Sequence, residues 1–122
     1  MSMTDILAEA LEKVKGARFA GVVGTDGLSV EMAFADDDDD CDLELAEIEL
    51  AALAASADAA SDRIGSGRVR DLIIEADDLT YLASAIAPGY FAVLGVRSNG
   101  SLGVGRARFA VHQMVTRMRE EL

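Results

Sequence analysis

The chain has 122 residues, of which 51% are apolar, and its 22 acidic and 11 basic side chains give a formal net charge of -11. This length and apolar content predict one folded domain, residues 1–122, and exclude a disordered chain. The acidic balance argues against nucleic acid and against an anionic membrane surface as partners, because phosphate binding needs clustered Lys and Arg.

The single cysteine, Cys41, permits no internal disulfide, which favours a reducing compartment. Residues 1–14 are amphipathic and acidic, unlike the basic and then apolar pattern of a signal peptide. No apolar run approaches the roughly 20 residues that a membrane-spanning helix requires. We therefore expect a soluble, cytoplasmic protein.

Eight elements are predicted in chain order from apolar periodicity, with Gly, Pro and Asp marking the turns. Gly16 is expected to stop the first helix, and Gly24–Gly27 to turn a hairpin. Gly65 should end the long central helix, and Ser101 should cap the last one. The expected elements are helix 4–14, strands 19–23 and 28–34, helix 43–64, strands 69–76, 79–87 and 90–96, and helix 102–121.

This order predicts an α+β domain, in which a five-stranded antiparallel sheet carries helices on both faces. The strands 79–87 and 90–96 are nearly continuous apolar runs, as expected for central strands that are covered on both sides.

The long helix 43–64 carries two apolar stripes, whereas a surface helix of a monomer needs only one. A second stripe favours a contact between molecules, the alternative being a helix buried on both sides of one fold. The pattern leaves open which stripe faces outward. The first stripe is Leu43, Ala46, Leu50, Leu53, Ala57, Ala60 and Ile64, and the second is Leu45, Ile48, Ala52, Ala55 and Ala59.

The side chains of catalysis are mostly missing. Cys41 lies beside five aspartates, which disfavour a thiolate, and the one histidine, His112, is interpreted as an ordinary residue of the last helix. The glycine-rich stretches 65–67 and 100–105 lack the ending of a phosphate-binding loop, so no nucleotide and no other cofactor is expected. The sequence predicts no free-standing enzyme.

The five-aspartate run partly fits a calcium-loop template. Asp36, Asp38, Asp40 and Glu47 fall at ligand positions, but Cys41 stands where the sharp turn requires glycine. We expect a solvated acidic loop and no metal site.

Residues 18–30 resemble the first hairpin of the roadblock/dynein-light-chain family, and the blocks 73–75, 90–94 and 99–106 are similar to its second half. The order of helices and strands resembles the family over nearly the whole chain. Within the family, the stretch Gly103-Val104-Gly105-Arg106 and its neighbours look most like the bacterial small-GTPase-activating members of gliding motility and cell polarity.

This resemblance implies a homodimer in which the long helices pair and the strands that follow them join into one sheet. It also implies a small Ras-like GTPase as partner, docked on the long helix, whose own catalytic residues are repositioned to stimulate GTP hydrolysis. No catalytic arginine is expected, and Arg63, Arg68 and Arg70, near the presumed docking platform, are interpreted as solvated or strand-edge charges. The alternative is a non-catalytic scaffold or an adaptor like a motor light chain.

Two sets of site residues are expected on this basis. The partner-binding set is Leu45, Ile48, Glu49, Ala52, Ala55, Ser56 and Ala59. The dimer set is Leu50, Leu53, Ala57, Ile64, Val69, Asp71 and Ile73.

Overall fold

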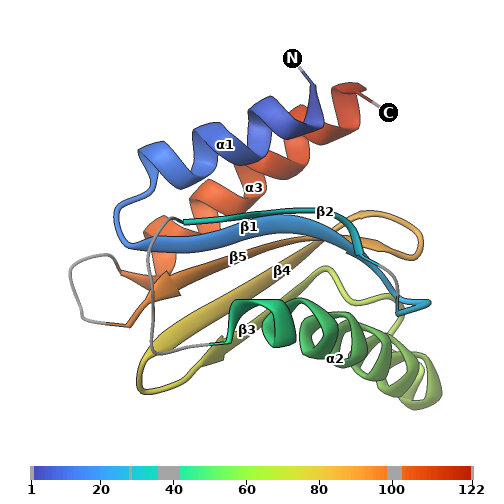
Figure 1. The fold of residues 1–122 in the computed structure, drawn as a ribbon. Coiled ribbons are helices and arrows are strands. Elements are labelled where there is room, and N and C mark those ends of the chain that lie inside the picture. The colour runs from blue at the N-terminus through green and yellow to red at the C-terminus, as the bar shows by residue number, and fades with distance from the viewer. Residues whose placement is uncertain (1, 28, 36–41, 99–102, 122) are drawn as a thin grey trace.

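The computed structural model describes residues 2–27, 29–35, 42–98 and 103–121 (Figure 1). Within them the predicted order of elements is confirmed. The elements are α1 (Met3–Lys13), β1 (Ala17–Gly24), β2 (Ser29–Phe34), α2 (Leu43–Ile64), β3 (Asp71–Glu75), β4 (Leu79–Ala87), β5 (Tyr90–Arg97) and α3 (Val104–Glu121).

The five strands form one sheet in the order β2-β1-β5-β4-β3, and every neighbouring pair is antiparallel. The prediction of an α+β fold with a five-stranded antiparallel sheet is therefore confirmed. The strands β4 and β5 lie inside the sheet, as their apolar runs predicted, and β2 and β3 form its two edges.

Helices cover both faces of the sheet, α1 and α3 on one and α2 on the other (Figure 1). The larger core lies under α1 and α3, where Ile6, Leu7, Val111 and Met118 pack against the sheet. The smaller core lies under α2 and is built around Phe19, Phe91 and Val93 of the sheet and Leu50, Ala51 and Ala54 of the helix.

The helices α1 and α3 run antiparallel. Glu9 of α1 forms an ion pair with Arg117 near the end of α3, while Lys13, one turn further along α1, lines a small hollow together with Ala110, about two turns earlier in α3. This register brings the first turn of α1 close to the last turn of α3, on the face of the sheet away from α2 (Figure 1).

The ends of α2 are fixed by local hydrogen bonds. The carboxylate of Asp42 accepts a bond from the backbone N–H of Leu45 at 3.0 Å, which satisfies one of the free donors of the first turn. Gly65 ends the helix with φ +87°, a conformation that glycine adopts without steric cost, as the sequence predicted.

Some predicted boundaries were wrong. The strand β3 begins at Asp71 rather than Val69, because the N–H of Val69 donates to the Asp58 carboxylate of α2 at 3.2 Å instead of to the sheet. The last helix begins at Val104 rather than residue 102. The acidic run 36–41 and the Ser101 cap lie outside the described residues.

Within the described ranges, no helix is both long and apolar enough to cross a membrane.

Candidate functional site

The buried face of α2 is a narrow stripe of small side chains. Leu50, which is 3% exposed, packs with Ala51 and Ala54 against the sheet. Asp58 and Ser61 continue this stripe toward the end of the helix, where Asp58 accepts from Val69 and the Ser61 hydroxyl donates to the backbone oxygen of Gly67 at 2.6 Å. These bonds attach the chain that follows α2 to the helix itself.

The opposite face of α2 presents apolar side chains to solvent. Ile48 is 60% exposed and Leu45 49%, and the small residues Ala52, Ser56 and Ala59 of the same face are exposed as well, while Leu53, 40% exposed, lies at its border. Burying a side chain of this size stabilises a protein by about 1.5–3 kcal/mol, so a row of them left in water is a surface suited to a protein partner. We name Leu45, Ile48, Glu49, Ala52, Ser56 and Ala59 the outer face of α2.

The predicted partner-binding residues fall on or beside this outer face. Leu45, Ile48, Glu49, Ala52, Ser56 and Ala59 are exposed, and Ala55 is half-buried. The sequence left open which of the two apolar stripes of α2 faces outward, and the structure shows that it is the second stripe. Their role in binding stays a prediction.

The predicted dimer residues are divided between two environments. Leu50 lies in the core of the protomer and offers no surface to a second copy, so we remove it from the proposed contact. Leu53, Ile64 and Ile73 are exposed large apolar residues, of which Ile64 is 79% exposed. Ala57, Val69 and Asp71 are half-buried.

Asp71, at the start of the edge strand β3, lies at the centre of a polar cluster. Its carboxylate accepts from the Ser84 hydroxyl at 2.8 Å and from Arg108 Nε at 3.0 Å, and His112 Nε2 lies 3.0 Å from both of its oxygens. Burial raises the pKa of Asp71, but the hydrogen bonds from His112, Ser84 and Arg108 and the charge of His112 outweigh it, so the pKa is lowered overall. The cluster fastens β3 to α3.

Sequence reasoning predicted neither this cluster nor the polar end of the buried stripe of α2. The cluster joins Asp71 and Ser84, from two strands, to Arg108 and His112, which lie one turn apart on α3, so no spacing within one segment could indicate it. Among the described residues, no group of three or more His, Cys, Asp or Glu side chains is arranged to hold a metal ion.

The fold is that of a known class of domain. Residues 3–96 match the Roadblock/LC7 domain, which covers more than half of the chain, and the protein belongs to this family. The helix α3 lies beyond the matched residues, although Ala107, Val111 and Met118 complete the larger core. No curated protein sequence matches the chain.

Solved structures resemble the chain over nearly its full length. MglC from Myxococcus xanthus is 27% identical, with a TM-score of 0.71 and 100% of both chains covered. The gliding protein MglB from Thermus thermophilus is 18% identical, with a TM-score of 0.78, 98% of this chain and 90% of that chain. An MglB with a tetrameric arrangement is 16% identical, with a TM-score of 0.80, 97% of this chain and 85% of that chain. The two MglB likenesses show a shared fold alone.

Proposed function

We propose that the protein is a homodimeric, cytoplasmic regulator of a small Ras-like GTPase in a motility or polarity system, and that the GTPase docks on the outer faces of α2. The observation that carries the proposal is the row of exposed apolar side chains on the outer face of α2, Leu45 and Ile48 among them. Membership of the Roadblock/LC7 family supports it, as does the likeness to the gliding protein MglB.

In the proposed dimer, the β3 edges of two copies pair and bring the two α2 helices together as one platform. An edge strand that ends a sheet has unpaired backbone groups, and pairing with a second copy would cover them. Ile73 on β3 and Leu53 and Ile64 on α2 are exposed and would bury apolar surface in this contact.

Regulation would act through the conformation of the GTPase rather than through chemistry supplied by this chain. A partner that binds the hydrolysis-competent state more tightly than the other states shifts the GTPase toward that state and raises its turnover. The outer face of α2 offers apolar and small side chains with one carboxylate, Glu49, and holds no nucleophile paired with a base.

The proposal is tested by capturing the partner and then measuring its turnover. Tagged protein is incubated with lysate of the source organism in the presence of GTP, a slowly hydrolysed GTP analogue or GDP. A small Ras-like GTPase retained mainly with the analogue is expected, and adding the purified protein to it should raise single-turnover GTP hydrolysis at least tenfold.

Two exposed apolar residues provide a matched pair of variants. Ile48→Arg on α2 should abolish both binding and stimulation, whereas Phe109→Arg on α3, where the side chain is 64% exposed, should leave both unchanged. A GTPase that binds with no change in hydrolysis would favour the scaffold instead. An equal loss of GTPase binding in Ile48→Arg and Phe109→Arg would contradict docking on α2.

A further inference from the structure

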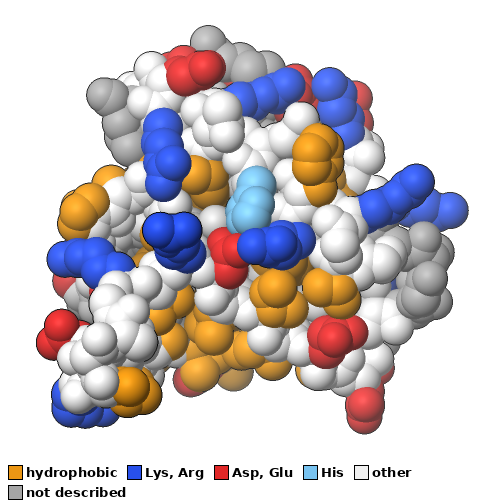
Figure 2. Space-filling model, turned by 180° about the vertical axis from the view of Figure 1, so that it is seen from behind, with side chains coloured by type: hydrophobic (Ala, Val, Ile, Leu, Met, Phe, Trp, Pro, Cys, Tyr) orange, Lys and Arg blue, Asp and Glu red, His pale blue; other side chains and the backbone are white. Residues whose placement is uncertain are grey.

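The charges of the three helices are divided unequally between the two faces of the sheet. On one face, α1 and α3 together hold five acidic and five basic residues, and Figure 2 shows Lys and Arg side chains gathered around the one histidine, His112 of α3. On the other face, α2 holds five acidic residues and one basic residue, Arg63 (Figure 1). The helix that presents the outer face therefore has a net charge of -4.

Two exposed carboxylates lie on one flank of α2, beside the outer face. Glu44 and Asp62 are each nine residues from Leu53, which is two and a half turns of a helix, so both lie on the side of α2 opposite Leu53. Neither carboxylate forms an ion pair with another described residue. We name Glu44 and Asp62, together with the half-buried Asp58 one turn before Asp62, the acidic flank.

The acidic flank borders a hollow of about 430 Å³ on the side of the β1–β2 turn. The hollow lies between α2 and Thr25, the first residue of that turn, and it includes Ala59, which belongs to the outer face. The hollow therefore continues the surface on which the partner is proposed to dock. The proposed dimer covers β3, at the other edge of the sheet, and the Leu53 side of α2, so it leaves the acidic flank open.

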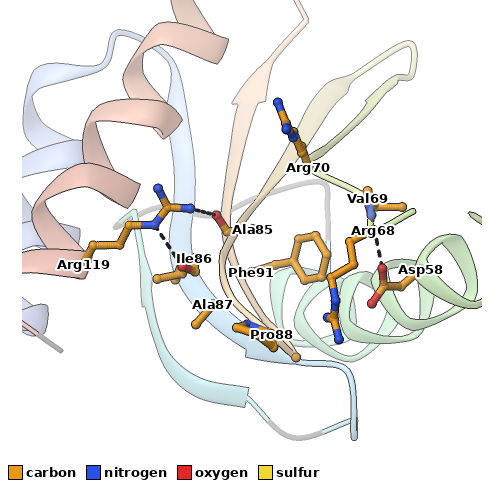
Figure 3. A pocket seen from close by; sticks show the side chains of 11 residues that line it. Asp58, Arg68, Val69, Arg70, Ala85, Ile86, Ala87, Pro88, Phe91 and Arg119 are labelled. Carbon is orange, nitrogen blue, oxygen red and sulfur yellow. Dashed lines mark hydrogen bonds between the residues drawn. The ribbon is translucent and has the colours of Figure 1, made fainter. Parts of the chain in front are cut away.

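The hollow holds more acidic than basic charge. Asp58 and Asp62 line it together with one arginine, Arg68. Figure 3 shows Arg68 beside Asp58, whose carboxylate accepts the N–H of Val69 at 3.2 Å, and no ion pair joins Arg68 to either aspartate. The hollow also lies at the C-terminal end of α2, where the helix dipole adds a partial negative charge. A positively charged side chain is therefore favoured there.

We propose that the acidic flank binds Lys and Arg side chains of the protein that docks on the outer face of α2, one of them in the hollow beside Asp62. The inference rests on the proposed function, because it names the chemistry of the docking partner. The surface of that partner combines an apolar centre, which covers Leu45 and Ile48, with basic side chains along one border. Complementary charges of this kind speed association and disfavour acidic partners.

A free cation fits the acidic flank less well than a protein does. Glu44 and Asp62 are 18 residues apart, about 27 Å along the helix, so no single ion can contact both. Arg68 repels a metal ion from the hollow. A small cation also leaves the exposed side chain of Ile48 in water, whereas a protein surface covers the carboxylates and the apolar side chains together.

The experiment measures the rate at which the captured GTPase associates with the protein as salt is raised. We expect this rate to fall at least fivefold between about 20 and 300 mM salt, because salt screens the attraction. Glu44→Lys/Asp62→Lys should slow association at least tenfold at low salt and remove most of the salt dependence. Glu12→Lys/Glu120→Lys makes the same change of charge at two exposed positions of α1 and α3 and should alter the rate by less than about twofold.

The acidic flank can fail while the proposed function stands. If Ile48→Arg abolishes GTPase binding but Glu44→Lys/Asp62→Lys associates as fast as the parent, the outer face is the docking site and the acidic flank takes no part. Equal slowing by the two charge-reversal double variants would trace the effect to net charge and would also overturn the inference.

A peptide probe tests the acidic flank even if no GTPase is captured. A labelled amphipathic Lys/Leu peptide is titrated with the protein and followed by fluorescence anisotropy, with a Glu/Leu peptide as its counterpart. We expect saturable binding of the Lys/Leu peptide, at least tenfold tighter than that of the Glu/Leu peptide. Ile48→Arg and Glu44→Lys/Asp62→Lys should each weaken it at least fivefold, and Glu12→Lys/Glu120→Lys should not. No binding, or equal weakening by the control, would overturn the inference.

Discussion

Phe19 and Gly95 face each other across β1 and β5, and the fit between them is tight. Phe19 is fully buried and stacks on Tyr81, with ring centroids 6.2 Å apart. A Cβ atom built on Gly95 would lie 2.2 Å from the Phe19 ring, well inside van der Waals contact. The ring of Phe19 therefore occupies the space that a side chain at position 95 would fill, and the core under α2 depends on glycine at that position.

Replacing Gly95→Ala is expected to destabilise the fold by about 1–3 kcal/mol, because the ring of Phe19 must move within a packed core. The unfolding midpoint in urea measures this change. Gly105→Ala is the control, since a Cβ there meets nothing and alanine favours the helix. The explanation is wrong if Gly95→Ala is as stable as the parent.

Asp71 makes the stability of the protein depend on pH. Its pKa is lowered in the folded state, so its contribution is present above the unfolded value of about 4 and is lost as the pH falls through the lower folded value. Asp71→Asn should cost about 1 kcal/mol at pH 7 and progressively less as the pH is lowered below about 4.

The measurement is the difference in unfolding free energy between the parent and Asp71→Asn across this pH range. Asp77→Asn, in the exposed turn after β3, is the control and should leave the unfolding free energy at pH 7 unchanged. If the loss of stability in Asp71→Asn stays constant down to the most acid pH, the shape of the Asp71 side chain, rather than its charge, accounts for its contribution to stability.

At the scale of the element, α2 shows how much of the fold its sequence could predict. Its limits of 43 and 64 were predicted correctly from helix formers and the glycine that ends it. The buried stripe was not predicted correctly. The polar residues Asp58 and Ser61 belong to it, and a search for apolar residues at helical spacing leaves them out. The first predicted stripe instead follows the border between the two faces, with Leu50 inside and Leu53 and Ile64 outside.

The same limit applies to the candidate site. The outer face of α2 could be predicted because its residues repeat along one helix. The polar cluster around Asp71 could not be, because Ser84 comes from β4 and Arg108 and His112 come from α3, and only the folded sheet brings them to Asp71.

Leu53→Glu tests the proposed dimer at this scale. Leu53 is 40% exposed in the protomer, so the variant should keep its helical circular dichroism while a charge in the apolar contact prevents pairing. Light scattering should then report a monomer. Val30→Glu, an exposed change on the opposite edge strand β2, should remain a dimer. If Leu53→Glu folds and is still a dimer, Leu53 and this part of α2 do not lie in the dimer contact.

At the scale of the whole molecule, one sheet separates two cores that depend on distant parts of the chain. The larger core needs both the first helix and the last, and α3 lies beyond the residues matched to the family. The match alone would place the end of the domain near residue 96, whereas Val111, Met114 and Met118 are buried in its core. Removing α3 would expose this face of the sheet.

Because the first turn of α1 lies near the last turn of α3, we predict that the order of elements along the chain can be altered while the fold is kept. A short glycine linker from residue 121 to residue 2, with new ends opened in the exposed turn between Asp77 and Asp78, would create a circular permutant that keeps every helix–sheet contact. We expect it to fold with the circular dichroism spectrum of the parent. Its new ends would lie beside β3, so a bulky fusion there would block pairing of that edge and turn the permutant into a reporter of dimerisation.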